Sequence, residues 1–130
     1  MTPLLLLLAT AGAGGVGAVL RFLLDTSVTG ALARRGRPPR ASWAIAGINL
    51  LGSAAIGGLS AGVASGLPLE WATVLGAGLL GGFTTFSAAS GETVRLLRDR
   101  RWGLAFLFGP VQLVLAVLAA GSAWALLGTA

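Results

Sequence analysis

Long apolar runs fill most of this chain, and short polar connections separate them. Four runs, at about 3–24, 42–65, 70–96 and 103–128, each contain roughly the 20 mostly apolar residues that a helix needs to cross a bilayer. None of the connections is long enough to separate a second domain. The pattern therefore predicts an all-α membrane protein with four transmembrane helices, folded as one domain over residues 1–130.

The first run raises the question of a cleaved signal peptide, which also contains an apolar stretch. No basic residue precedes this run, and it stays apolar past Val19 without a polar cleavage region. We therefore expect the run to be retained as the first span.

Composition supports a membrane protein and argues against an enzyme. Hydrophobic residues make up 55% of the chain, its mean hydropathy is +0.88, and only 10% of its residues are charged. A soluble domain has about 25% charged residues. The chain has no cysteine and no histidine, and its four carboxylates are scattered from Asp25 to Asp99. This composition excludes disulfides and the commonest metal ligands, and no nucleophile lies beside a base.

The arginines are distributed very unevenly. Eight of the nine lie in the first connection (25–41) or the third (95–102), whereas the second connection (65–70) and both chain ends have none. These eight are Arg34, Arg35, Arg37, Arg40, Arg95, Arg98, Arg100 and Arg101. The positive-inside rule places the first and third connections in the cytoplasm and both termini outside, and we expect no nucleic-acid binding. Arg21 is expected to reach toward the cytoplasm and to pair with Asp25.

Tryptophans and glycines also fit a helical membrane bundle. The four tryptophans lie close to predicted helix ends, where their rings anchor at the interface. They are Trp43, Trp71, Trp102 and Trp124. Glycines recur every four residues at 58, 62 and 66 and again at 78 and 82, a spacing that lets membrane helices approach closely.

Asn49 lies in the middle of the second apolar run, with Ser53 one turn later on the same face. A buried amide in hydrocarbon is costly unless it has partners. Two interpretations remain open at this point. Asn49 forms a hydrogen bond between helices, or it is a donor that lines an aqueous or ion path.

The segment "GGFTTFSAASGE" (81–92) is poor helix material inside the third run. It predicts a broken helix, which is tolerated at membrane depth only inside protein or along a wet cavity. A break presents carbonyls to cations and a helix N-terminus to anions. Phe83 and Phe86 are three apart, and the positive edge of such rings can face an anion, although ordinary packing explains them as well. Glu92 either belongs to this polar site or forms an ion pair with Arg95.

Three motifs resemble those of the CrcB/Fluc fluoride channels: "GGVGAVLRFLL" (14–24), "GINLLGS" (47–53) and "GGFTTFSAASGE" (81–92). The resemblance implies a small antiparallel dimer of four-helix subunits in the bacterial cell membrane, with the third helix broken. Such a dimer passes fluoride passively out of the cytoplasm through two pores along the subunit interface. It also implies a structural sodium ion at the centre of the dimer.

The resemblance assigns individual residues as well. It places Asn49, Phe86, Ser87, Ser90 and Glu92 along the fluoride pore, and the phenylalanine spacing adds Phe83. The backbone carbonyls of Gly81 and Thr84 would hold the sodium ion, and Arg21 matches the arginine that ends the first span.

The chain departs from the family pattern in two places. The second phenylalanine of the family falls at Ala89 and the intervening threonine at Ala88. The fourth span has no tyrosine and reads "AFLFGPVQL" where the family carries polar pore groups. Together with the one-sided arginines, these departures predict an obligate heterodimer with an oppositely inserted homologous chain and one degenerate pore; the alternative is pairing with itself.

Two other functions are compatible with four spans. A small multidrug-type transporter needs a carboxylate deep in the first span, but Asp25 lies at its edge. A non-conducting membrane subunit that stabilises a paired channel chain is favoured by the missing phenylalanine.

Overall fold

The computed structural model describes residues 1–35 and 41–128, and the side chains of all of these except 41 and 42. Every regular element in these ranges is helical, as predicted. The elements are α1 (Pro3–Arg34), α2 (Ala41–Ala64), α3 (Leu69–Ala72), η1 (Thr73–Leu80), α4 (Gly81–Phe83), α5 (Phe86–Arg98), α6 (Trp102–Phe106), η2 (Leu107–Val111) and α7 (Gln112–Gly128). The segments η1 and η2 are π-helical.

These elements form four helices that are long and apolar enough to cross a membrane, which confirms the four predicted spans. They are Pro3–Arg34, Trp43–Ala64, Leu69–Arg98 and Trp102–Gly128. Few of their residues are buried within the chain, because a thin four-helix layer has little interior. The large exposed apolar side chains are suited to lipid or to a partner chain.

α1 continues ten residues beyond its predicted end at residue 24 and stops at Arg34. Its 32 residues span about 48 Å, more than the roughly 30 Å of hydrocarbon. The hydroxyls of Thr26 and Thr29 donate to carbonyls of their own helix, so these polar residues do not end it. The expected ion pair between Arg21 and Asp25 is wrong for the described chain, because none of its ion pairs joins them.

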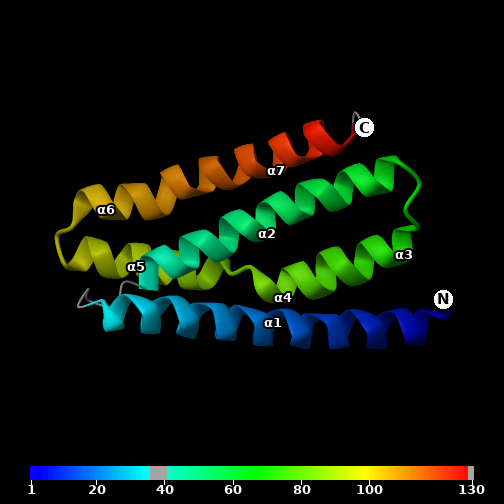
Figure 1. Ribbon diagram of the computed structural model, residues 1–130, viewed down its shortest axis with the longest axis horizontal. Coiled ribbons are helices and arrows are strands. Elements are labelled where there is room, and N and C mark those ends of the chain that lie inside the picture. Colours follow the sequence, from blue (N-terminus) through cyan, green and yellow to red (C-terminus); the bar gives the residue numbers. More distant parts are fainter. Residues whose placement is uncertain (36–40, 129–130) are drawn as a thin grey trace.

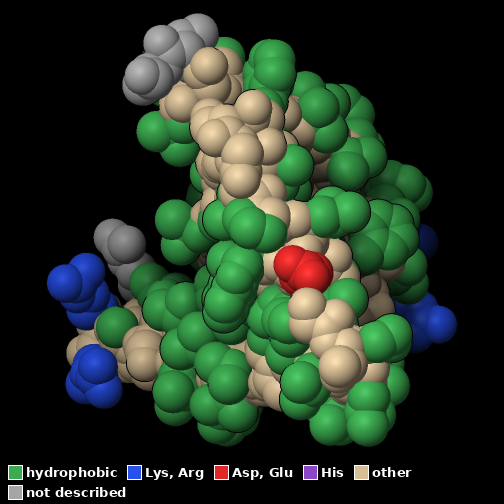
Figure 2. Space-filling model, turned by 90° about the vertical axis from the view of Figure 1, so that its right-hand side faces the viewer, with side chains coloured by type: hydrophobic (Ala, Val, Ile, Leu, Met, Phe, Trp, Pro, Cys, Tyr) green, Lys and Arg blue, Asp and Glu red, His purple; other side chains and the backbone are tan. Residues whose placement is uncertain are grey.

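The helices lie side by side, with α7 along α2, and with η1 and α4 along α1 (Figure 1). The N-terminus, the end of α7 and the α2–α3 connection lie at one end of the layer, where the Met1 amino group is 2.8 Å from Glu70 Oε1. Figure 2 looks at this end, which is covered mainly by hydrophobic side chains.

The opposite end of the layer carries the C-terminus of α1 and the α5–α6 turn (Figure 1). Six of the eight connection arginines belong to these two segments, while Arg37 and Arg40 lie outside the described residues. The predicted grouping of the connections is therefore confirmed. That the arginine-rich end is cytoplasmic stays a prediction.

Glycines bring α1 against the third span. A Cβ atom on Gly17 would lie 2.0 Å from the carbonyl oxygen of Leu79, and one on Gly82 would lie 2.2 Å from that of Gly14. A Cβ on Gly78 would lie 2.7 Å from the carbonyl oxygen of Thr10. The close approach predicted from the spacing of residues 78 and 82 is confirmed.

In the second span the prediction is confirmed for Gly58, where a Cβ would lie 3.1 Å from the side chain of Leu127 on α7, and is wrong for Gly62 and Gly66. The tightest glycine of α2 against α7 is Gly57, where a Cβ would lie 2.0 Å from the carbonyl oxygen of Ala120. Gly58 and Gly62 meet only side chains, at 3.1 Å or more. Gly66 lies in the turn after α2 with φ of +102°, a conformation that glycine adopts without strain.

The tryptophans lie near helix ends, as predicted. Trp43 is the third residue of α2, Trp102 begins α6, Trp71 lies in α3, and Trp124 lies in the last part of α7. Trp43 also packs edge-to-face on Phe108, with ring centroids 4.9 Å apart. This contact adds to a small buried cluster at the arginine-rich end that includes Leu96 and Ala105.

Candidate functional site

The third span is broken at Thr84 and Thr85, as the sequence predicts. Both residues are extended, with φ and ψ of −81° and 158° at Thr84 and −149° and 115° at Thr85. α5 then begins at Phe86, and the hydroxyl of Thr85 caps it by accepting from the amide of Ala88 at 3.2 Å. The break divides the span into two shorter helices that meet in the middle of the layer (Figure 1).

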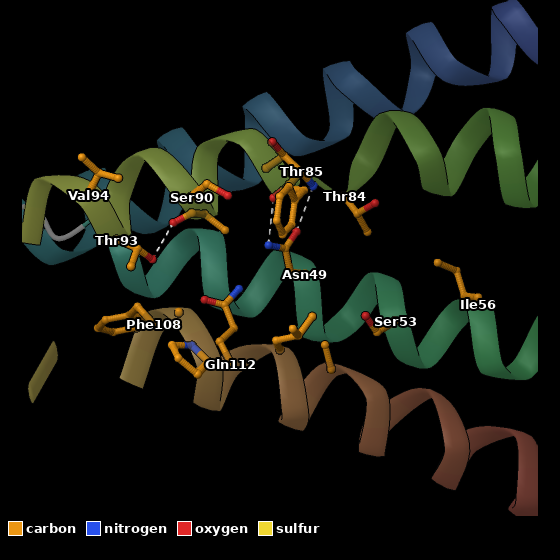
Figure 3. A pocket seen from close by; sticks show the side chains of 16 residues that line it. Asn49, Ser53, Ile56, Thr84, Thr85, Ser90, Thr93, Val94, Phe108 and Gln112 are labelled. Atoms are coloured by element: carbon orange, nitrogen blue, oxygen red, sulfur yellow. Dashed lines mark hydrogen bonds between the residues drawn. The ribbon is translucent and has the colours of Figure 1, made fainter. Parts of the chain in front are cut away.

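Asn49 of α2 forms two hydrogen bonds with the backbone at the break. Its Nδ2 donates to the Thr85 carbonyl at 3.0 Å, and its Oδ1 accepts from the Thr85 amide at 2.9 Å (Figure 3). The interhelical hydrogen bond proposed for Asn49 is therefore confirmed. Nδ2 carries two protons, however, and this contact uses one, so the amide keeps a second N–H for another acceptor.

The break also removes the helical partners of the two carbonyls predicted to bind sodium. In a continuous helix the amide of Thr85 would donate to the carbonyl of Gly81, but it donates to Asn49. The amide of Ala88 would donate to the carbonyl of Thr84, but it donates to the hydroxyl of Thr85. Both carbonyl oxygens are therefore released from the helical pattern at the site where the resemblance implies a cation.

A cavity of about 610 Å³, open at the surface, lies beside the break between α2, α5 and α7 (Figure 3). None of the described residues that line it is charged. They are Asn49, Ser53, Ile56, Thr84, Thr85, Phe86, Ala89, Ser90, Thr93, Val94, Phe108, Gly109, Pro110, Gln112, Leu113 and Ala116.

The structure thus brings three of the predicted pore residues to one cavity: Asn49, Phe86 and Ser90. Ser87 is exposed and does not line the cavity, although its hydroxyl lies 3.3 Å from that of Thr85. The functional roles of these residues stay predictions.

Phe83 and Glu92 do not line the cavity. The backbone nitrogen of Phe83 lies 2.9 Å from where a Cβ on Gly17 of α1 would be. The ring of Phe83 lies 3.3 Å from where a Cβ on Gly52 of α2 would be, so Phe83 packs between α1 and α2. Glu92 is buried, and both of its oxygens accept from Arg95, at 2.8 and 2.5 Å. The packing interpretation of Phe83 and the ion pair of Glu92 are confirmed.

Arg21 also lies outside the cavity lining, on α1. Phe86 is 79% exposed and Gly81 is exposed as well, although both lie at the break. The surface around the break is thus open to lipid or to another chain.

Several cavity residues did not follow from the sequence. Thr85 holds the break through its backbone, which no side-chain pattern reveals. Thr93 and Phe108 reach the cavity from helices whose relative position depends on the tertiary fold. For Gln112 the sequence holds one indication of a special role, because it is the only side-chain amide in the fourth apolar run.

Known proteins resemble the chain over most of its length. Residues 8–128 match the family described as "CrcB-like protein, Camphor Resistance (CrcB)". "Fluoride-specific ion channel FluC 1" of Leifsonia xyli is 45% identical over 122 residues, which are 93% of this chain and 85% of that protein. "Fluoride-specific ion channel FluC" of Phenylobacterium zucineum is 42% identical over 121 residues, or 89% of this chain and 91% of that protein.

A third relative, "Fluoride-specific ion channel FluC 2" of Mycobacterium tuberculosis, is 41% identical over 107 residues, which are 82% of this chain and 79% of that protein. These relatives are named as ion channels, which agrees with the expectation that the chain is not an enzyme. Together with the four membrane-length helices, the comparisons support a multi-pass membrane protein.

Proposed function

Because the chain belongs to the CrcB family, we propose that it is a subunit of a fluoride channel in the bacterial plasma membrane. The observation that carries this proposal is the broken third helix, held by Asn49 beside a cavity of uncharged polar groups. Three relatives named as fluoride-specific channels, at 41–45% identity, support the choice of ion.

The groups around the cavity suit a small, strongly hydrated anion. Such an ion needs hydrogen-bond donors in place of its water, and it must be held weakly enough to leave. The second N–H of Asn49, the hydroxyl of Ser90 and the ring edge of Phe86 are uncharged groups that can meet this need. The N-terminus of α5 begins at the break, so the positive end of its dipole also favours an anion there.

The proposal includes a direction and a sidedness. Channel flow is passive, so fluoride leaves the cell whenever its internal concentration and the membrane potential favour outward movement. The arginine-rich end with the α5–α6 turn faces the cytoplasm, and both termini face outward.

A structural sodium ion is part of the proposal. The released carbonyls of Gly81 and Thr84 are the oxygen ligands that such an ion prefers at a broken membrane helix. When bound, sodium would supply a fixed positive charge between two broken helices. Unfolding temperature in sodium, potassium and choline chlorides tests this, because a specific ligand stabilises the folded state. We expect the highest temperature in sodium, and equal values in all three salts would contradict the site.

The second subunit is proposed to be a homologous chain in the opposite orientation. Phe86 and Gly81 are exposed at the break, where a partner would cover them. The one-sided arginines favour one orientation for this chain, so pairing with itself in an antiparallel sense is disfavoured. Ala88 and Ala89 leave the polar set of one pore incomplete.

Growth of a bacterium that lacks its own fluoride channel tests the function. The chain is expressed alone, with a homologous chain of opposite arginine bias, or as the control variant Ser60→Ala, whose hydroxyl bonds only to its own helix. We expect fluoride resistance from the pair and from the paired control, and little from the chain alone. Membrane-inserted protein that gives no resistance in any arrangement would contradict the proposed function.

A further inference from the structure

The α5–α6 turn carries three arginine side chains that the fold itself does not use. Arg98 ends α5, Arg100 and Arg101 follow it, and all three residues are exposed. None of them forms an ion pair or a side-chain hydrogen bond within the part of the chain that the structure describes. Asp99, the only carboxylate of the turn, lies 3.7 Å from Nη1 of Arg95 instead. The turn therefore presents three guanidinium charges that no described carboxylate pairs with.

The backbone of this turn holds a charged side chain where helices ordinarily have glycine. The amide of Arg100 donates to the Leu97 carbonyl at 3.0 Å, and the amide of Arg101 donates to the Leu96 carbonyl at 2.9 Å. These two bonds form the Schellman motif, whose left-handed position suits glycine or asparagine. That position is Arg100, with φ of +56°, and no other non-glycine residue of the described chain has a positive φ. Such a conformation costs stability, which indicates a role for this side chain outside the fold.

The turn lies at the end of two membrane-length helices, where phospholipid headgroups are found. It joins the spans Leu69–Arg98 and Trp102–Gly128 at the arginine-rich end of the layer (Figure 1). Trp102 directly follows the arginines and is 67% exposed, and tryptophan rings prefer the level of the headgroups. Phe106 lies one turn further along the same face and is 63% exposed. The arginines are therefore followed by an uncovered apolar surface that begins at the interface.

An anionic phospholipid matches both parts of this surface. Arginine binds phosphate oxygens through paired N–H···O bonds, and its guanidinium is more weakly hydrated than an ammonium group. Basic residues beside a membrane helix attract anionic lipids in particular. The acyl chains of the same molecule can cover the rings of Trp102 and Phe106. A soluble phosphate or an acidic protein in solution would leave these rings uncovered.

We propose that the α5–α6 turn binds an anionic phospholipid of the adjacent leaflet, with Arg98, Arg100 and Arg101 on the phosphate and with Trp102 and Phe106 against an acyl chain. None of these five residues lines the cavity beside the broken helix, so the lipid site is separate from it. The inference does not depend on which ion the chain conducts. Bound lipid offsets the strain at Arg100 and holds the ends of the third and fourth spans together.

Native mass spectrometry of the purified protein in detergent tests the site. Phosphatidylglycerol is the anionic probe, and phosphatidylcholine, whose headgroup has no net charge, is the control lipid. We expect the wild type to bind the first about tenfold more tightly than the second. Arg98→Gln combined with Arg101→Gln should remove most of this preference. Arg34→Gln combined with Arg35→Gln removes two arginines at the C-terminal end of α1 and should keep it.

Two results of this experiment overturn the proposal. One is a wild type that shows no preference for phosphatidylglycerol. The other is an equal loss of preference in both double variants, which would indicate a general attraction to positive charge. The same spectra report the number of chains in each assembly. A variant at the turn that loses a subunit but keeps its lipid would mean that a second chain, and not a lipid, covers the turn.

Arg100→Gly gives a test in which the fold is not weakened. Glycine adopts a positive φ without strain, so this variant should unfold at a higher temperature than the wild type in lipid-free detergent. Phosphatidylglycerol should raise the unfolding temperature of the wild type and raise that of the variant less, because a ligand of the folded state stabilises it. Equal shifts in the two proteins would contradict a role of Arg100 in lipid binding.

Inorganic phosphate distinguishes a lipid site from a site for any phosphate. At the same concentration it should leave the unfolding temperature of the wild type unchanged, because it covers no apolar surface. A shift as large as that caused by phosphatidylglycerol would show that the turn binds a free anion, and the lipid proposal would be wrong.

Discussion

At the scale of single residues, Asn49 decides the shape of the third span. Its side-chain amide takes the place of the hydrogen-bond partners that Thr85 would have in a continuous helix. The side chain accepts from the backbone N–H of Thr85 at 2.9 Å and donates to the Thr85 carbonyl at 3.0 Å. The sequence predicted a costly amide but not its partner, because Thr85 is 36 residues away and contributes only backbone atoms. The two interpretations of Asn49 therefore could not be separated until the fold placed α2 against the break.

Asn49→Leu should destabilise the fold strongly. It leaves the amide and carbonyl of Thr85 buried with fewer partners, at about 1–3 kcal/mol for each unsatisfied group. We expect a lower unfolding temperature in detergent and faster hydrogen exchange at the amide of Thr85. Ser60→Ala, on the same helix, should leave both unchanged. Wild-type exchange at Thr85 in the leucine variant would show that Asn49 does not hold the break.

At the scale of helices, glycines set the distances between spans. Of Gly15 and Gly17 in the motif at 14–24, Gly17 lies against the third span and Gly15 does not. A Cβ there would overlap the Leu79 carbonyl, and backbone cannot move aside as a flexible side chain can. Gly15 has nothing within 4 Å of its Cβ position.

Gly17→Ala should therefore separate α1 from η1 and α4, whereas Gly15→Ala should be tolerated. We expect the first variant to lose most of its folded yield in detergent, as judged by size-exclusion chromatography, and the second to match the wild type. Equal behaviour of the two variants would mean that α1 does not pack on the third span through Gly17.

The sequence predicts those elements whose pattern lies within one short stretch of the chain. The break follows from adjacent glycines and threonines in an apolar run, and four spans follow from the length of the runs. The extension of α1 to Arg34 was missed because its threonines satisfy their hydroxyls within the helix. The π-helical segments were missed because their geometry depends on packing against neighbouring helices. Choosing Gly57 over Gly58 requires knowledge of which face of α2 meets α7.

At the scale of the whole molecule, the arginines should fix one orientation in the membrane. The chain has no cysteine, so single cysteines can be introduced without background. Ser65→Cys lies in the connection after α2, and Asp99→Cys lies in the turn after α5. In intact spheroplasts, an impermeant maleimide should label the first and spare the second until the membrane is opened. Equal labelling of both would indicate insertion in two directions and favour pairing of the chain with itself.

The most direct test of the proposed channel is ion release from proteoliposomes, measured with fluoride-selective and chloride-selective electrodes. Purified chain is reconstituted alone and together with its oppositely oriented homologue, and the liposomes are loaded with fluoride or with chloride. We expect rapid release of fluoride by the pair, retention of chloride, and little release by the chain alone. Retention of fluoride by every assembly would contradict the channel, and full fluoride release by the chain alone would contradict the heterodimer.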